Sequence, residues 1–252
     1  MLVQYGSLLE HSTEEATSRF LSPIFNHLVA EFGFSFRNLP ESLIKGRITT
    51  KGKIEYCLKA FGSVSILVME VKLRCGGTEE RLDAIAQVIA ECDVCDWNNS
   101  TQNFSVPLFG ILWDGTYFHF FKFDGTSKPP SFLRGAFSAD PIKFRRGIKL
   151  PDLTDADESA LPFIRTVRLI SEVVFDLFLS GYVSSIEAFC DQSSVRSAKE
   201  GTRKSLTRWE DGLTSAQQAL HHFRDAESKR QGRDKTGADQ AVSHAQMLLK
   251  RR

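Results

Sequence analysis

Apolar residues in the first part of the chain recur at spacings of three and four. This period predicts an amphipathic helix that ends near Gly33. Ser12 and Glu15 form the S-x-x-E pattern of a capping box, which predicts the start of the same helix. Pro23 predicts a kink or an early break, because proline lacks the amide donor. The apolar stripe consists of Phe20, Leu21, Ile24, Phe25, Leu28, Val29 and Phe32.

The pattern then changes to that of strands. Residues 53–59 alternate between polar and apolar side chains, which predicts one strand. Residues 64–73 form an apolar run rich in β-branched side chains, as in a buried central strand. A turn around Gly62 joins the two strands, and the period of residues 78–92 predicts a helix after them.

A second pair of strands is predicted at residues 106–113 and 117–123. Asp114-Gly115 between them is a strong signal for a hairpin turn. The pair is dense in aromatic residues, which we interpret as core packing because both faces of such a sheet are usually covered.

The rest of the chain is predicted to be helical. Residues 161–179 form a strong amphipathic pattern, and Gly181 is expected to separate this helix from a shorter one at residues 183–190. Further on, a narrow a/d seam precedes a second helix at residues 238–252. These features predict an antiparallel helical hairpin, or an arm that packs on a partner. The seam consists of Leu206, Trp209, Leu213, Ala216, Leu220 and Phe223.

Together these elements predict an α/β fold with a central mixed sheet flanked by helices and a C-terminal α-helical extension. The expected division is a domain over residues 1–192 and a basic helical hairpin or arm over residues 193–252. The formal net charge of the whole chain is only +1, but the charges are unevenly distributed. The net charge is −4 over residues 1–189 and +5 over residues 190–252. A basic extension could hold a polyanion near an acidic domain.

The composition favours an intracellular protein without a membrane span. The most apolar long stretch, residues 161–179, is interrupted by charged residues, and the first residues show no secretory signal. The five scattered cysteines make a poor disulfide framework, and Cys92 and Cys95 lack the second ligand pair of a structural zinc site.

Two charges interrupt the predicted central strand. Glu70 and Lys72 are two residues apart, so they face the same side of the sheet. Burial of a charge is costly unless it is paired or binds a metal. Taken alone, the two residues favour a plain ion pair. Glu55 on the preceding strand can lie across from them, and two carboxylates with an ammonium group suit a divalent-metal site.

In this order of elements the sequence resembles the PD-(D/E)XK nuclease superfamily, over residues 15–124. The motifs are an acidic helix, a strand with Glu55, the E-x-K of Glu70 and Lys72, and a helix with Gln87. The closest resemblance is to the nuclease domain of the type I restriction enzyme motor subunit, and fungal nuclease-like proteins look similar. The family usually has Asp where this chain has Glu55, and inactive members are common.

The resemblance implies a restriction-endonuclease-like core that cleaves DNA, or less expectedly RNA, with Mg²⁺ or Mn²⁺. Glu55, Glu70 and the backbone carbonyl of Val71 would hold the ion, and Lys72 would assist the attacking water. Gln87 would position Lys72, the water or the phosphate; alternatively it is a polar helix residue at the border of the core.

Three other residue sets complete the list of candidates. Glu15, or Glu14, is either an outer acid of the site or part of the helix cap, and the cap is favoured. Asp83 and Glu91 are expected on a solvated helix face. The basic run either contacts phosphates or is a solvated loop; it consists of Lys143, Arg145, Arg146 and Lys149.

The alternative function is a nuclease-like domain without catalysis that binds nucleic acid or protein, or acts as an effector. In either case the expected partner is nucleic acid, DNA before RNA. Residues 193–252 are a further candidate surface for a homodimer or for another protein.

Overall fold

The computed structural model describes residues 10–39, 42–44, 52–135, 146–151, 160–200 and 207–250. Nine strands lie within these residues: β1 (Phe36–Asn38), β2 (Ser42–Ile44), β3 (Gly52–Ile54), β4 (Tyr56–Ala60), β5 (Val64–Val71), β6 (Leu108–Trp113), β7 (Tyr117–Asp124), β8 (Ser131–Arg134) and β9 (Ile148–Lys149). Helices are α2 (Glu14–Ala30), the 3₁₀ helix η2 (Gly33–Ser35), α3 (Thr78–Thr101), α4 (Leu161–Glu200), α5 (Thr207–Gln231) and α6 (Lys235–Lys250).

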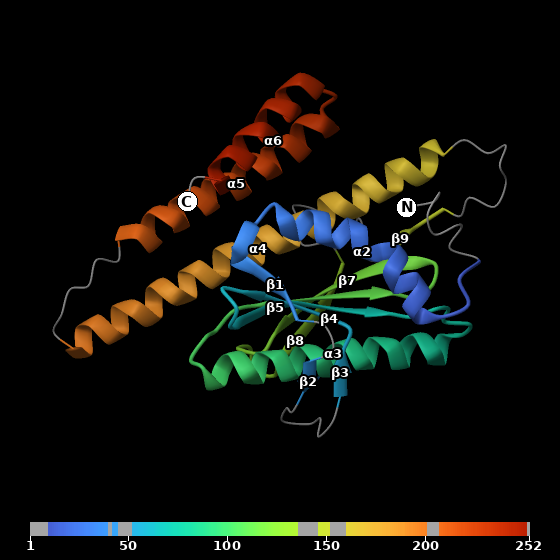
Figure 1. Ribbon diagram of the computed structural model, residues 1–252, viewed down its shortest axis with the longest axis horizontal. Coiled ribbons are helices and arrows are strands. Elements are labelled where there is room, and N and C mark those ends of the chain that lie inside the picture. Colours follow the sequence, from blue (N-terminus) through green and yellow to red (C-terminus); the bar gives the residue numbers. More distant parts are fainter. Residues whose placement is uncertain are drawn as a thin grey trace.

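Seven of these strands form one mixed sheet in the order β1-β4-β5-β6-β7-β8, with β9 paired to β7. Only β5 and β6 run parallel among these pairs, and α3 is the crossover between them. Helix α3 covers one face of the sheet, whereas α2 and α4 cover the other (Figure 1). The prediction of a mixed sheet flanked by helices, followed by C-terminal helices, is therefore confirmed.

The core has two parts, one on each face of the sheet. The larger part lies between the sheet and the helices α2 and α4, and the smaller part lies under α3. All eight residues of β5 are buried, as expected for a central strand. Trp113 and Phe118 of the aromatic hairpin are fully buried, so core packing explains these rings. All five cysteines are free, and Cys92 and Cys95 lie on the buried face of α3.

Helix α2 differs in two details from the sequence prediction. Its N-cap is Thr13, not Ser12, and the Thr13 hydroxyl accepts a hydrogen bond from the Ala16 amide at 3.1 Å. Pro23 lies inside the helix without ending it. The apolar face on both sides of Pro23 is buried against the core, and this packing outweighs the lost backbone hydrogen bond.

Helix α4 is continuous over 40 residues, so the predicted break at Gly181 is wrong. A Cβ atom at Gly181 would lie 3.1 Å from the Ile66 Cβ of β5. Glycine at this position lets the helix lie close to the sheet, and the buried face compensates its low helix propensity. Position 192, the end of the predicted first domain, lies within this helix.

The stretch Leu161–Val195 of α4 is long and apolar enough to cross a membrane by length and composition alone. However, 61% of its most apolar window is buried inside the protein, as in the core helix of a globular fold.

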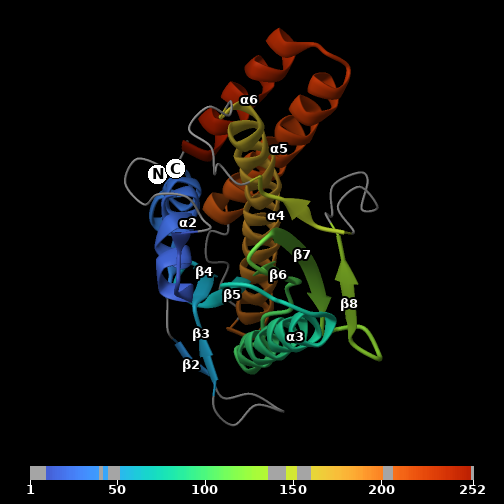
Figure 2. The same cartoon turned by 90° about the vertical axis from the view of Figure 1, so that its right-hand side faces the viewer.

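Helices α5 and α6 form the predicted hairpin, and α5 packs on α4 of the same chain (Figure 2). The Phe223 ring of α5 packs against Phe175 of α4 at 4.8 Å between ring centroids. Arg224 pairs with the buried Asp176 at 3.0 Å, and Arg230 pairs with Glu172. The hairpin therefore shares the main core. A partner or second copy bound through residues 193–252 stays a prediction.

Candidate functional site

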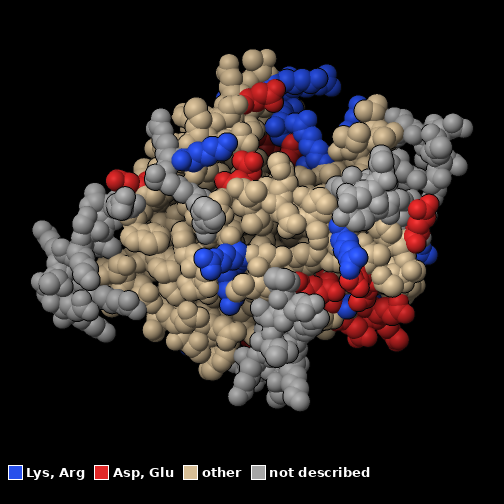
Figure 3. Space-filling model, in the orientation of Figure 1, with Lys and Arg blue, Asp and Glu red and all other residues tan. Residues whose placement is uncertain are grey.

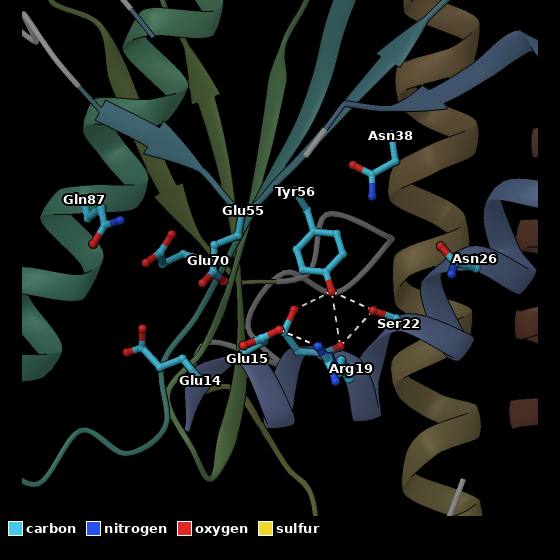
Figure 4. A pocket seen from close by; sticks show the side chains of 11 residues that line it. Glu14, Glu15, Arg19, Ser22, Asn26, Asn38, Glu55, Tyr56, Glu70 and Gln87 are labelled. Carbon is cyan, nitrogen blue, oxygen red and sulfur yellow. Dashed lines mark hydrogen bonds and ion pairs between the residues drawn. The ribbon is translucent and has the colours of Figure 1, made fainter. Parts of the chain in front are cut away.

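A pocket of about 710 Å³ lies at the carboxyl end of β5, between α2 and α3 (Figure 4). One end, which we call the acidic end, is lined by Glu14, Glu55, Glu70 and Gln87. The other end, which we call the neutral end, is lined by Ser18, Ser22, Asn26, Asn38 and Tyr56. Glu15 and Arg19 also line the pocket and pair with each other at 2.6 Å.

Glu70 and Lys72 occupy the end of the central strand. Glu70 shares a strand face with Val68, which packs under α3, so its side chain is directed toward that helix. It is only 2% exposed, and its Oε1 lies 2.6 Å from the Lys72 ammonium. Burial alone would lower the pKa of Lys72, but the hydrogen bond and charge of Glu70 outweigh burial and raise it. Lys72 is therefore a protonated cation at neutral pH.

Glu55 interrupts the strand that the sequence predicts at residues 53–59. The prediction of one strand is wrong, because residues before Glu55 form β3, which pairs with β2, and residues after it form β4 of the main sheet. The register pairs Tyr56 with Met69, which places Glu55 across from Glu70. A Glu55 carboxylate oxygen accepts a hydrogen bond from the Val71 amide at 3.0 Å. Glu55, Glu70 and Lys72 therefore meet at one place.

The ionisation of Glu55 is strongly perturbed. Burial and the neighbouring Glu70 carboxylate raise its pKa to about 7, although the Val71 amide opposes the shift. At neutral pH the Glu55 carboxyl group is therefore close to half protonated.

Glu91 of α3 lies beside the acidic end, next to Glu70 and Gln87, and its sequence pattern did not indicate this position. The prediction of a solvated position is wrong, because Glu91 is 2% exposed and faces the sheet. Its Oε1 accepts a hydrogen bond from the Gln87 side chain at 3.1 Å. Burial and the charge of Glu70 raise the pKa of Glu91 to about 9, so it is neutral at pH 7. The signal was its position three residues after Val88 and next to Cys92, both of which are buried.

The remaining predicted residues are distributed unevenly. Glu14, rather than Glu15, faces the site, with an oxygen 4.0 Å from the Lys72 ammonium. Glu15 is exposed and bound to Arg19. Arg146 and Lys149 are exposed and are not among the described residues that line the pocket. Lys143 and Arg145 lie outside the described residues.

The acidic end fits a hard divalent cation by its chemistry. Carboxylate oxygens are the ligands that Mg²⁺ and Mn²⁺ prefer. The carboxyl groups of Glu70 and Glu91 lie close together, and one oxygen of each is shielded from solvent. Acidic side chains also gather over the first turns of α2 and α3, near this end of the pocket (Figure 3). In the described part of the chain, no three His, Cys, Asp or Glu side chains are arranged as a metal-binding group.

Comparisons with family models, with curated proteins and with solved structures give no match to this chain.

Proposed function

We propose that the protein is a metal-dependent nuclease that hydrolyses phosphodiester bonds of DNA, with RNA as the less expected substrate. The observation that carries this proposal is that Glu55 and Glu70 line one pocket and that Lys72 pairs with Glu70 beside it. Two carboxylates beside a partly exposed ammonium group are the parts that metal-assisted hydrolysis of a phosphodiester needs.

Glu55 and Glu70 would hold Mg²⁺ or Mn²⁺, with the Val71 backbone carbonyl as a further oxygen ligand. The bound ion supplies positive charge that polarises the phosphate and lowers the pKa of a water molecule. The restriction-endonuclease-like core that the resemblance implies is part of the same proposal.

Lys72 and Gln87 supply the other functions of the site. The Lys72 ammonium stays protonated beside Glu70, so it can stabilise the charge that develops on the phosphate. Gln87 lines the pocket and can orient the phosphate or the water through its amide. Glu14 adds a carboxylate near Lys72 that keeps the ammonium directed to the site.

The uneven distribution of charge along the chain supports a polyanionic substrate. Residues 190–252 carry a net charge of +5, most of which lies outside the α5–α6 hairpin, because residues 207–250 hold seven Lys and Arg against six Asp and Glu. A basic surface raises the local concentration of a nucleic acid and steers it toward the acidic pocket, where the cation offsets repulsion.

A second candidate is a nucleic-acid-binding module without hydrolysis. The observation that favours it is that the polar groups of the acidic end already bind one another. Lys72 is paired with Glu70, and the Gln87 amide is hydrogen-bonded to Glu91.

A cleavage assay separates the two candidates. Plasmid and single-stranded DNA are incubated with Mg²⁺ or Mn²⁺ and with wild type, Glu70→Gln or Lys72→Met, while Glu210→Gln, exposed on α5 and outside the pocket lining, serves as the matched control. The nuclease proposal expects cleavage by wild type and by the control, and none by the two site variants. Absence of cleavage by wild type under both metals, together with DNA binding, would establish the binding module instead.

A further inference from the structure

The neutral end of the pocket is built from a stripe on one helix and two residues that face it. Ser18, Ser22 and Asn26 are spaced by four residues, so they share one face of α2 over about 12 Å. Asn38 of β1 and Tyr56 of β4 line the same space from the sheet. Figure 4 shows the Tyr56 ring between the acidic side chains and the two asparagines.

The chemistry of this end differs from that of a phosphate site. Arg19 is the single cation among the described lining residues, and its guanidinium is bound to Glu15 at 2.6 Å. Phosphate sites are made of Arg, Lys and amide donors, whereas amide and hydroxyl side chains that donate and accept recognise base edges and sugars. Among the described residues the Asn38 Oδ1 has no hydrogen-bond partner, so the wall holds an acceptor that a base edge could satisfy.

The Tyr56 ring is held in a fixed position. The Tyr56 hydroxyl oxygen lies 2.5 Å from the Ser18 hydroxyl oxygen and 2.7 Å from that of Ser22. The same hydroxyl can donate its hydrogen to the Ser18 backbone carbonyl, at 3.1 Å. These contacts anchor the phenol at its tip. A fixed, half-buried aromatic ring is the platform on which an unpaired base packs in proteins that bind single strands.

We infer that the neutral end binds the base of an unpaired nucleotide next to the phosphodiester held at the acidic end, with Tyr56 as the stacking surface and Asn38 as a partner of the base edge. The substrate class is therefore a single strand, a flap or an extruded nucleotide. This inference rests on the proposed function for the position of the phosphodiester.

The pocket is large enough to receive an unpaired base. A volume of about 710 Å³ suits a molecule of one or two rings with its attached groups. A base that is still paired lies inside the double helix, so an enzyme pocket receives it only after it has left the stack.

The experiment measures binding without cleavage. Fluorescence anisotropy titrations use a short single-stranded oligothymidine, a duplex of equal length, and a base-free deoxyribose-phosphate oligomer, all in Ca²⁺ and repeated in EDTA. We expect the oligothymidine to bind wild type about tenfold more tightly than the base-free oligomer, because one base–aromatic stack is worth that much. Equal affinity for the two oligomers would overturn the inference.

Variants test the assigned side chains. Tyr56→Leu removes the ring and is expected to abolish the preference for bases, whereas Tyr56→Phe keeps the ring and should retain most of it. Asn38→Ala is expected to weaken oligothymidine binding, and Asn98→Ala, outside the pocket lining, is the matched control. Thermal unfolding of each variant identifies any that fail to fold. An unchanged base preference in folded Tyr56→Leu would overturn the assignment of Tyr56.

The binding experiment and the cleavage assay can fail independently of each other. Base-dependent binding that Tyr56→Leu removes, without metal-dependent cleavage by wild type, would refute the nuclease proposal and support the nucleotide site. Metal-dependent cleavage with equal binding of the base-free oligomer would support the nuclease and overturn the nucleotide site. Tighter binding of duplex than of oligothymidine would also overturn the site.

Discussion

Replacement of Glu91 by Gln tests whether this side chain is a buried neutral acid. Its pKa in the folded protein is about 9, against an ordinary value of 4.5. The folded state therefore binds this proton more tightly than the unfolded chain does. The stability that the proton contributes is fully present below pH 4.5 and is lost as the pH rises toward 9. Glutamine has nearly the same shape, keeps an acceptor for Gln87 and never loses a proton.

The expected gain in stability follows from the difference between the pH and the ordinary pKa of glutamate. At pH 7 the Glu91 carboxylate of the unfolded chain must be protonated when the chain folds. Because pH 7 is 2.5 pH units above the ordinary pKa, this protonation costs about 3 kcal/mol. Glu91→Gln removes this cost. We therefore expect the variant to be more stable than wild type by up to about 3 kcal/mol at pH 7, about 2 kcal/mol at pH 6 and about 1 kcal/mol at pH 5.

Urea unfolding in EDTA, followed by circular dichroism at several pH values, measures the difference. Glu79→Gln is the control, because Glu79 is exposed in the first turn of the same helix. The reasoning would be refuted if the difference between Glu91→Gln and wild type did not grow with pH, or if the variant were less stable throughout.

Three further predictions concern packing and charge. Lys72→Met should destabilise the protein by about 3 kcal/mol, because it leaves the buried Glu70 carboxylate without its cation, and adding Glu70→Gln should restore most of this stability in a double-mutant cycle. Gly181→Ala should cost about 1 to 2 kcal/mol by overpacking against the sheet, whereas Gly212→Ala in α5, where a Cβ atom meets nothing within 4 Å, should gain up to about 1 kcal/mol; calorimetry of the pair tests the sign of each. Phe223→Ala should cost about 3 kcal/mol in the whole protein and lower a single unfolding transition, and a separate early transition would show that the hairpin unfolds by itself.

The sequence predicted the elements whose signals are strong and local. The apolar run of β5, the Asp114-Gly115 turn and the stripe of α2 all correspond to elements of the structure. The same local rules failed where tertiary contacts decide. Glycine at position 181 reads as a helix break, yet it allows α4 to lie against Ile66. Pro23 likewise stays inside a helix whose buried face holds it in place.

The part of the candidate site that lies on the strands was predictable from the sequence. The two-residue spacing of Glu70 and Lys72, and the hairpin that brings Glu55 near them, follow from the alternation of strands. The burial of Glu91 depends on how α3 rotates on the sheet, and a charged residue within a helix pattern suggests the opposite. The neutral end was not predictable, because its residues come from α2, β1 and β4 and carry no motif.

The unbroken course of α4 has a consequence for how the protein unfolds. At 1.5 Å per residue this helix spans about 60 Å, and its surface joins the sheet to the α5–α6 hairpin without a hinge. A chain cut after residue 192 would keep most of the helix while uncovering the apolar residues under α5, among them Phe175 and Ile186. The slowest-exchanging backbone amides of α4 and α5 should therefore open together with those of β5, as one cooperative unit.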